Sequence, residues 1–180
     1  LSPLNPWRYP DAVTALASWS QQHYEALAQE LHRVSGVDPQ FERSGLLDFA
    51  PGEVDEALAW AARHQIDMRA VSAAEVAEIE PAYGGDSEGA LWLPQVGQLR
   101  NPWLLRALIE TCRKQGVELI DHVEIESVTQ IDGRVTGVKS KTTSYEANLV
   151  VVAGGAWVLY KRWKSGWALD AYDGHEIKEG

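Results

Sequence analysis

A continuous apolar run, Leu149-Val150-Val151-Val152, constrains the possible fold more than any other feature of the chain. Such a run, with no polar alternation, is typical of a strand buried on both faces of a sheet. It leads directly into Ala153-Gly154-Gly155-Ala156-Trp157. Because glycine has no Cβ, such a strand exit lets another backbone or a flat ligand come close, and ligands in open α/β sheets gather at the carboxyl ends of strands. A tight strand exit without any ligand is the alternative interpretation.

Helices and strands alternate along the rest of the chain, which indicates an α/β or α+β class. Apolar periodicity and end signals predict helices over 11–34 and 53–64, a short helix after Ser72, and one from Asn101 to Gly116. Strands are predicted over 45–49, 68–71, 90–93, 118–120, 123–131, 134–139, near 145 and over 149–152. Asp132-Gly133 predicts a two-residue hairpin turn, and Ser72 with Glu75 predicts a capping box.

Two of the predicted helices carry an apolar stripe that we expect to be buried. The stripe of the first helix is formed by Val13, Leu16, Tyr24, Leu27, Leu31 and Val34. That of the last helix is formed by Leu104, Leu105, Leu108, Ile109 and Cys112. The Asn101 side chain is expected to cap the start of this last helix.

The composition excludes several classes of function. The net charge of −10 disfavours nucleic acid and anionic membrane surfaces as partners, and no apolar run is long enough to span a membrane. The single cysteine, Cys112, rules out an internal disulfide and predicts a reducing, cytoplasmic location. The five histidines show no metal-ligand spacing, and no nucleophile elbow or Walker loop is present, so neither a metal site nor a catalytic cluster is predicted.

Several motifs together resemble one family. The hairpin Asp132-Gly133-Arg134-Val135-Thr136-Gly137-Val138, followed by Val150 to Trp157, resembles the FAD-dependent oxidoreductases of the D-amino-acid oxidase type, although Gly154 stands where alanine is usual. Three further segments resemble the glycine oxidases of thiamine-thiazole synthesis: the opening Leu1-Ser2-Pro3-Leu4-Asn5-Pro6-Trp7-Arg8-Tyr9-Pro10, Ser44 to Leu47, and Gly97 to Pro102. The resemblance covers about residues 1–157.

The resemblance implies an α/β fold in which part of an FAD-binding, Rossmann-like domain is interleaved with an α+β segment of a substrate domain. Residues 1–38 and 101–157 are then parts of the FAD-binding domain, 39–100 belong to the substrate domain, and 158–180 form a tail that returns toward the substrate domain. The cofactor-binding positions implied are Leu1 and Ser2 beside the flavin ring, Ile125 at the adenine, and Ala153, Gly154, Gly155, Ala156 and Trp157 beside the pyrophosphate and ribose. No catalytic side chain is assigned.

The chain departs from the family pattern in three places. The glycine-rich loop that binds the FAD pyrophosphate would precede Leu1, so we expect the chain to be a fragment without it. The family's substrate-binding arginine and active-site aromatic lie in its C-terminal half. The tail from Val158 does not continue the family pattern smoothly, which leads us to expect residues missing between Trp157 and Val158; a divergent tail is the alternative.

By resemblance the parent enzyme oxidises glycine or another small amino acid or amine to an imine that hydrolyses to a keto acid and ammonia, with release of hydrogen peroxide. A sarcosine-oxidase-like or D-amino-acid dehydrogenase activity is the alternative within this scaffold. A non-catalytic fragment or interaction module without flavin is the alternative from another class, and an unrelated α/β domain is the third. Because a partial domain exposes sheet edges, we also expect the chain to self-associate or form a homo-oligomer.

Overall fold

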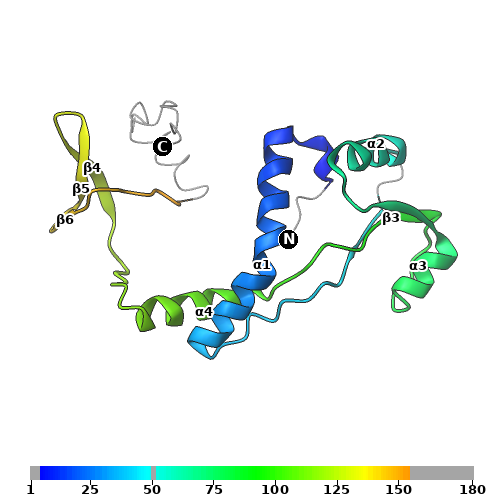
Figure 1. The fold of residues 1–180 in the computed structure, drawn as a ribbon, viewed down its shortest axis with the longest axis horizontal. Coiled ribbons are helices and arrows are strands. Elements are labelled where there is room, and N and C mark those ends of the chain that lie inside the picture. The colour runs from blue at the N-terminus through cyan, green and yellow to red at the C-terminus, as the bar shows by residue number, and fades with distance from the viewer. Residues whose placement is uncertain (1–4, 50–51, 155–180) are drawn as a thin grey trace. The chain divides into compact units, whose positions relative to one another are not determined.

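The helices and strands predicted from sequence periodicity form most of the secondary structure of the protein (Figure 1). The computed structural model describes residues 5–49 and 52–154. The chain divides into two compact units, residues 1–119 and 120–180.

The first unit contains four α-helices, one 3-10 helix and three strands within its described residues. In chain order these are η1 (Pro6–Arg8), α1 (Asp11–Ser35), β1 (Leu46–Asp48), α2 (Val54–His64), β2 (Arg69–Ser72), α3 (Ala73–Ile79), β3 (Gly89–Leu93) and α4 (Asn101–Lys114). The second unit contains β4 (Ile125–Ile131), β5 (Arg134–Ser140) and β6 (Ser144–Glu146).

The core of the first unit forms on the two faces of an antiparallel sheet with the strand order β1-β3-β2. Successive side chains of a strand point to opposite faces. On one face Leu91 and Leu93 of β3 pack with α2 and η1 in a cluster completed by Trp7, Ala57, Trp60 and Ala61. On the other face Val71 and Ala90 pack against Val76 of α3. Both helices therefore cover this sheet, one on each side.

Gly45, directly before β1, is required by both its conformation and its neighbour. Its φ is +71°, in the left-handed region that favours glycine. A Cβ at this position would lie 1.9 Å from the Trp92 ring. The motif Ser44-Gly45-Leu46-Leu47 therefore serves close packing of the chain against β3.

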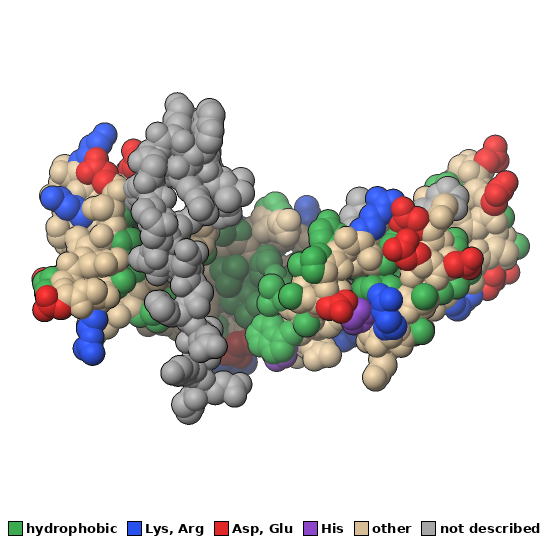
Figure 2. All heavy atoms as spheres, turned by 90° about the horizontal axis from the view of Figure 1, so that it is seen from above, with side chains coloured by type: hydrophobic (Ala, Val, Ile, Leu, Met, Phe, Trp, Pro, Cys, Tyr) green, Lys and Arg blue, Asp and Glu red, His purple; other side chains and the backbone are tan. Residues whose placement is uncertain are grey.

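The helices α1 and α4 contact each other, and most of the buried residues in the two helices are small. The buried residues of α1 are Thr14, Ala28, Leu31 and Ser35, and those of α4 are Ala107 and Thr111. The prediction that the larger apolar residues form the buried stripes is therefore wrong in large part, since Leu16 is 67% exposed and Leu105 is 59% exposed. Hydrophobic side chains consequently lie at the surface where α1 and α4 are placed (Figure 2).

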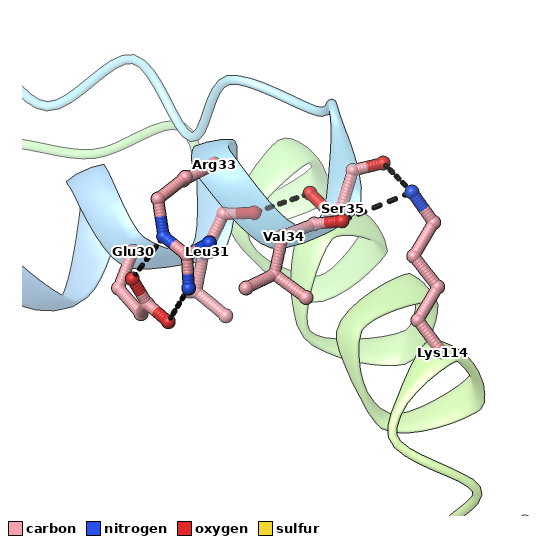
Figure 3. A network of polar contacts seen from close by, with 6 residues as sticks. All are labelled: Glu30, Leu31, Arg33, Val34, Ser35 and Lys114. Carbon is pink, nitrogen blue, oxygen red and sulfur yellow. Dashed lines mark hydrogen bonds and ion pairs between the residues drawn. The ribbon is translucent and has the colours of Figure 1, made fainter.

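The C-terminal end of α1 is held by Lys114, at the end of α4 (Figure 3). The Lys114 ammonium donates to the carbonyl oxygens of Val34 at 2.9 Å and Ser35 at 3.2 Å. These carbonyls have no partner within the helix, and a cation is favoured at the negative end of the helix dipole. The contact thus joins segments of the chain that are 80 residues apart.

Two connecting segments, 39–45 and 94–100, run side by side between the helix pair and the sheet of the first unit (Figure 1). Glu42 and Gln98 exchange backbone hydrogen bonds of 3.0 and 2.8 Å. The Gly45 N–H donates to Val96, and the Arg100 N–H donates to Pro39. The sheet is therefore attached to the helix pair by a double connection rather than by a single flexible linker.

The second unit is an antiparallel sheet with the order β4-β5-β6. The predicted hairpin turn is confirmed, because Asp132 and Gly133 both adopt positive φ, as a type I′ turn requires. Gly137 of β5 has a φ of +152°, and a Cβ there would lie 2.0 Å from the carbonyl oxygen of Tyr145 in β6. Only glycine fits this close approach of the two strands.

Three sequence predictions of local structure are wrong. Residues 118–120 form no strand, and neither do residues 149–152. The apolar run is instead exposed, with Leu149 and Val151 each 78% accessible. A strand buried on both faces needs neighbouring strands and covering helices, and the described part of the second unit provides only β4, β5 and β6. At the start of α4, Arg100 and not Asn101 occupies the cap position, because Asn101 already lies inside the helix.

Within the described residues, no helix is both long enough and apolar enough to cross a bilayer.

Candidate functional site

The predicted cofactor-binding residues fall into two groups. Ile125, Ala153 and Gly154 are described, and all three belong to the second unit. Leu1, Ser2, Gly155, Ala156 and Trp157 lie outside the described residues. The structure therefore gives the local setting of three positions, and all eight cofactor contacts stay predictions.

Ile125 is the first residue of β4 and pairs with Ser140 of β5. The register of the two strands shifts between Ile125 and Ser127, which marks a β-bulge or a similar irregularity of the ladder. Bulges bend a strand and interrupt its regular ladder, and they are frequent beside ligand sites. The local geometry at Ile125 thus suits a contact between its backbone and a base, the role that the resemblance implies for it.

Ala153 and Gly154 follow the exposed apolar run in irregular chain. Ala153 is exposed and Gly154 is half-buried. Small side chains at these two positions leave the backbone accessible, which is what close approach of a pyrophosphate or ribose requires. The described residues therefore fit a backbone-mediated dinucleotide contact, although no strand leads into them.

A cluster of polar contacts around Glu53 was not predicted from the sequence. Its carboxylate accepts hydrogen bonds from Trp7 Nε1 at 2.5 Å and Arg8 Nε at 2.9 Å, and it forms a second contact with Arg8 through Nη2. The partners lie 46 and 45 residues apart in sequence. No local pattern indicates this pairing; the only sequence indication was that Trp7 and Arg8 belong to a recognisable motif.

The surroundings of this cluster shift the pKa values of two neighbouring carboxyl groups in opposite directions. Hydrogen bonds from Arg8 and then Trp7 lower the pKa of Glu53. Burial raises the pKa of Asp48, at the end of β1, and the nearby Glu53 adds to this effect while Arg8 opposes it. Asp48 Oδ2 is buried and has no hydrogen-bond partner among the described residues. Glu53 is consequently the charged partner of Arg8.

Arg8 and Arg100, which stand in the motifs shared with glycine oxidases, already have side-chain partners in this structure. Arg8 is held by Glu53, and Arg100 Nη1 donates to Gln40 Oε1 at 3.3 Å. Among residues 5–49 and 52–154, no group of three or more histidine, cysteine or acidic side chains could hold a metal ion.

A cavity in the first unit lies between α1, η1 and the end of β3, where Thr14 and Trp60 line it. Its volume of about 30 Å³ compares with several hundred Å³ for pockets that enclose a drug-sized ligand. This cavity is therefore too small for a dinucleotide.

Comparison with known proteins decides the family. Residues 3–165 match the protein family described as FAD dependent oxidoreductase. The chain belongs to this family. The prediction of an α/β chain that carries part of an FAD-binding fold is thereby confirmed, and so is the expected link to FAD-dependent oxidation.

Within the FAD dependent oxidoreductase family, the chain is similar to glycine oxidases. It is 39% identical to glycine oxidase of Pseudomonas putida over 158 residues, which are 87% of this chain and 43% of that protein. It is 35% identical to glycine oxidase of Pseudomonas aeruginosa, with the same coverage. The solved glycine oxidase of Bacillus cereus shares the fold, with a TM-score of 0.74 and 24% identity over 83% of this chain and 42% of that chain. The chain thus spans less than half the length of these relatives.

Proposed function

We propose that this chain is part of an FAD-dependent oxidase that acts on glycine or a similarly small amino acid or amine. The observation that carries the proposal is the identity to glycine oxidases over nearly the whole chain, together with membership of the FAD dependent oxidoreductase family. A place in thiamine-thiazole synthesis and a cytoplasmic location belong to the same proposal. A sarcosine-oxidase-like or D-amino-acid dehydrogenase activity is the alternative on the same scaffold.

In the proposed reaction glycine is oxidised to an imine with loss of two electrons, and water hydrolyses the imine to glyoxylate and ammonia. Molecular oxygen takes up the two electrons and two protons to give hydrogen peroxide. FAD supplies the redox chemistry when it is bound, and the protein orients the reactants. The described residues need only bind and position the reactants, which agrees with the lack of a proton-transfer cluster among these residues.

We assign the cofactor contacts as follows. Ile125 meets the adenine through its backbone, beside the register shift of β4. Ala153 and Gly154, with Gly155, Ala156 and Trp157, lie beside the pyrophosphate and ribose. Leu1 and Ser2 pass the flavin ring. Residues 1–38 and 101–157 then belong to the FAD-binding domain, and residues 39–100 to the substrate domain.

The first experiment is the visible absorption spectrum of the purified full-length oxidase of which we propose this chain to be part, recorded before and after incubation with FAD and gel filtration. We expect a retained flavin band, and formation of hydrogen peroxide on addition of glycine. Faster peroxide formation with sarcosine or a D-amino acid would favour the alternative enzymes. A protein that retains no flavin would contradict the proposal and support the non-catalytic interaction module.

A pair of matched variants tests the assigned contacts. Gly154→Leu places a large side chain at a half-buried position beside the proposed pyrophosphate contact, so we expect weaker retention of FAD. Gly84→Leu is the control, because a Cβ at Gly84 meets no atom within 4 Å. Equal FAD retention by the two variants would remove Gly154 from the site.

We also propose that the chain self-associates. Large apolar side chains are exposed on α1 and α4 of the first unit and at Leu149, Val151 and Val152 of the second. Exposed apolar patches favour contacts with further protein. Sedimentation velocity over a range of concentrations tests this, and a monomer at every concentration would refute it.

A further inference from the structure

A second pocket of the first unit lies on its sheet where α2 begins. Its volume is about 250 Å³, and its lining includes the end of β1, parts of β2 and β3, and Val54, the first residue of α2. Asp48, Leu91 and Ala70 are paired across the three strands, so their side chains form one row on one face. Ala70 has a short side chain, and Gly89, two residues before Leu91, has none. These two small residues leave space beside Asp48, and we call this space the Asp48 pocket.

The carboxylate of Asp48 is buried at the edge of this pocket. Asp48 is 8% exposed, and its Oδ2 has no hydrogen-bond partner among the described residues. Burial raises the pKa of Asp48, because the charged form loses contact with water. Arg8 is a nearby cation, but Glu53 binds its guanidinium through two nitrogens. A positively charged donor that entered the pocket would therefore offset the cost of burying this carboxylate.

The rest of the lining indicates which kind of cation fits. Glu88 is exposed and supplies a second carboxylate, whereas Val54, Val71 and Leu91 supply aliphatic surface. Two carboxylates beside aliphatic side chains suit an ammonium head, which has three donors, on a short carbon chain. Divalent metal ions take more oxygen ligands than these two side chains offer. The volume is below that of pockets for drug-sized ligands, so the carbon chain must be short.

We propose that the Asp48 pocket binds a primary alkylammonium group, whose charge pairs with Asp48 and Glu88 and whose carbon chain packs against Val54 and Leu91. The group comes from a free small amine or from a lysine side chain, which carry the same head. The inference goes beyond the proposed function. The residues that line the pocket lie in the first unit, and none of them is assigned a contact with FAD.

The test titrates the protein with n-propylammonium chloride in phosphate buffer and follows the backbone amides of Gly89 and Ala90 by NMR. We expect saturable shifts with a Kd on the order of 1 mM, because a ligand of so few atoms binds weakly. Propan-1-ol and sodium propionate have the same carbon chain without the positive charge, and neither should bind. Equal shifts with sodium chloride at the same ionic strength would reveal a general salt effect and would overturn the proposal.

Two variants separate the charge from the space. Asp48→Asn keeps the shape of the side chain, and we expect about tenfold weaker binding of propylammonium. Ala70→Leu fills the pocket at an exposed position without changing any charge, and binding should be lost. Glu78→Gln and Ala74→Leu make matched changes at exposed positions of α3 outside the pocket and should leave the Kd unchanged. With circular dichroism unaltered, undiminished binding by Asp48→Asn or by Ala70→Leu would overturn the proposal.

Nα-acetyl-lysine amide distinguishes the two sources of the ammonium group. Tighter binding of this compound than of propylammonium would support the pocket as a site for a lysine side chain. Weaker binding would support it as a site for a free amine. Failure of the unmodified protein to bind either compound would overturn the proposal, and none of these measurements depends on FAD.

Discussion

The two units of this protein differ in how they bury apolar side chains. In the first unit, a sheet of three strands is covered by α2 on one face and α3 on the other, and Leu91 is 1% exposed. In the described part of the second unit, only Gly137 and Ser140 are buried, and neither has an apolar side chain. Both sheets have three strands. The number of strands therefore does not decide how much apolar surface a sheet buries; the helices that cover the sheet do.

The comparison also separates two kinds of apolar sequence. The strand β3, Gly89–Leu93, and the run Leu149–Val152 are both rich in aliphatic residues. The first is paired on both sides, by β1 and β2, and becomes core. The second forms no ladder in the described structure and stays exposed. An apolar run shows what a segment can bury, and the surrounding elements determine whether it does.

The largest expected effect comes from truncating the core of the first unit. Leu91→Ala removes a side chain that packs under α2, so we expect a loss of about 2–5 kcal/mol in the free energy of unfolding. Leu149→Ala makes the same change at a site that is 78% exposed, with an expected change below about 0.5 kcal/mol. Urea unfolding followed by tryptophan fluorescence measures both. Similar losses in the two variants would show that Leu149 is buried in solution and would break the comparison.

A smaller effect is expected where the second unit depends on a single glycine. Gly137→Ala forces a Cβ against the Tyr145 carbonyl and a strained φ, at an expected cost of about 3 kcal/mol. Amide hydrogen exchange should show loss of protection in β5 and β6 while the amide of Leu91 stays protected. Gly133→Ala, at the open hairpin turn, is the control and should cost about 1 kcal/mol. Loss of protection at Leu91 would mean that the two units unfold together.

The capping box at the start of α3 gives a pH-dependent effect in the first unit. Ser72 Oγ accepts from the Glu75 N–H, and the Ser72 N–H donates to the Glu75 carboxylate. This backbone hydrogen bond, followed by that from Arg69, lowers the pKa of Glu75 from its ordinary 4.5 to about 2. A lowered pKa adds stability that is complete above the unfolded value and is lost as the pH falls through the folded value.

We therefore expect the thermal stability of the protein to fall between about pH 4.5 and pH 2 more steeply than that of Glu75→Gln. Ser72→Ala should cost about 1 kcal/mol at neutral pH through loss of the cap. Glu78→Gln, exposed on the same helix, is the matched control for the acid titration. Identical pH profiles for the protein and Glu75→Gln would contradict the capping role.

The smallest expected effect is at the contact between α1 and α4. Lys114→Met removes the ammonium that binds the Val34 and Ser35 carbonyls, and we expect a loss of about 0.5–1 kcal/mol that shrinks at high salt. Lys141→Met, at an exposed position of the second unit, should leave the unfolding free energy unchanged. A salt-independent loss in Lys114→Met would indicate that packing of its methylene chain, and not its charge, stabilises α1.

The sequence by itself determined the features that depend on neighbouring residues. The capping box at Ser72 and the Asp132-Gly133 turn follow from local hydrogen bonding and from backbone conformations that few residues adopt, and both are present. The motifs around Gly45 and from Asp132 to Gly137 also placed the chain in its family, because close approaches such as that of Gly137 to Tyr145 admit one residue type. All of the cofactor-binding positions, including Ile125, Ala153 and Gly154, remain predictions.

Only the tertiary structure decided which apolar faces are buried and which charges meet. Helical periodicity favoured Leu16 and Leu105 as buried residues, yet both are exposed, whereas Ala28 of α1 and Ala107 of α4 are buried. The same holds for Glu53, whose partners lie more than 40 residues away. Burial and ion pairing depend on which segments the fold brings together, and no periodicity within a single segment contains that information.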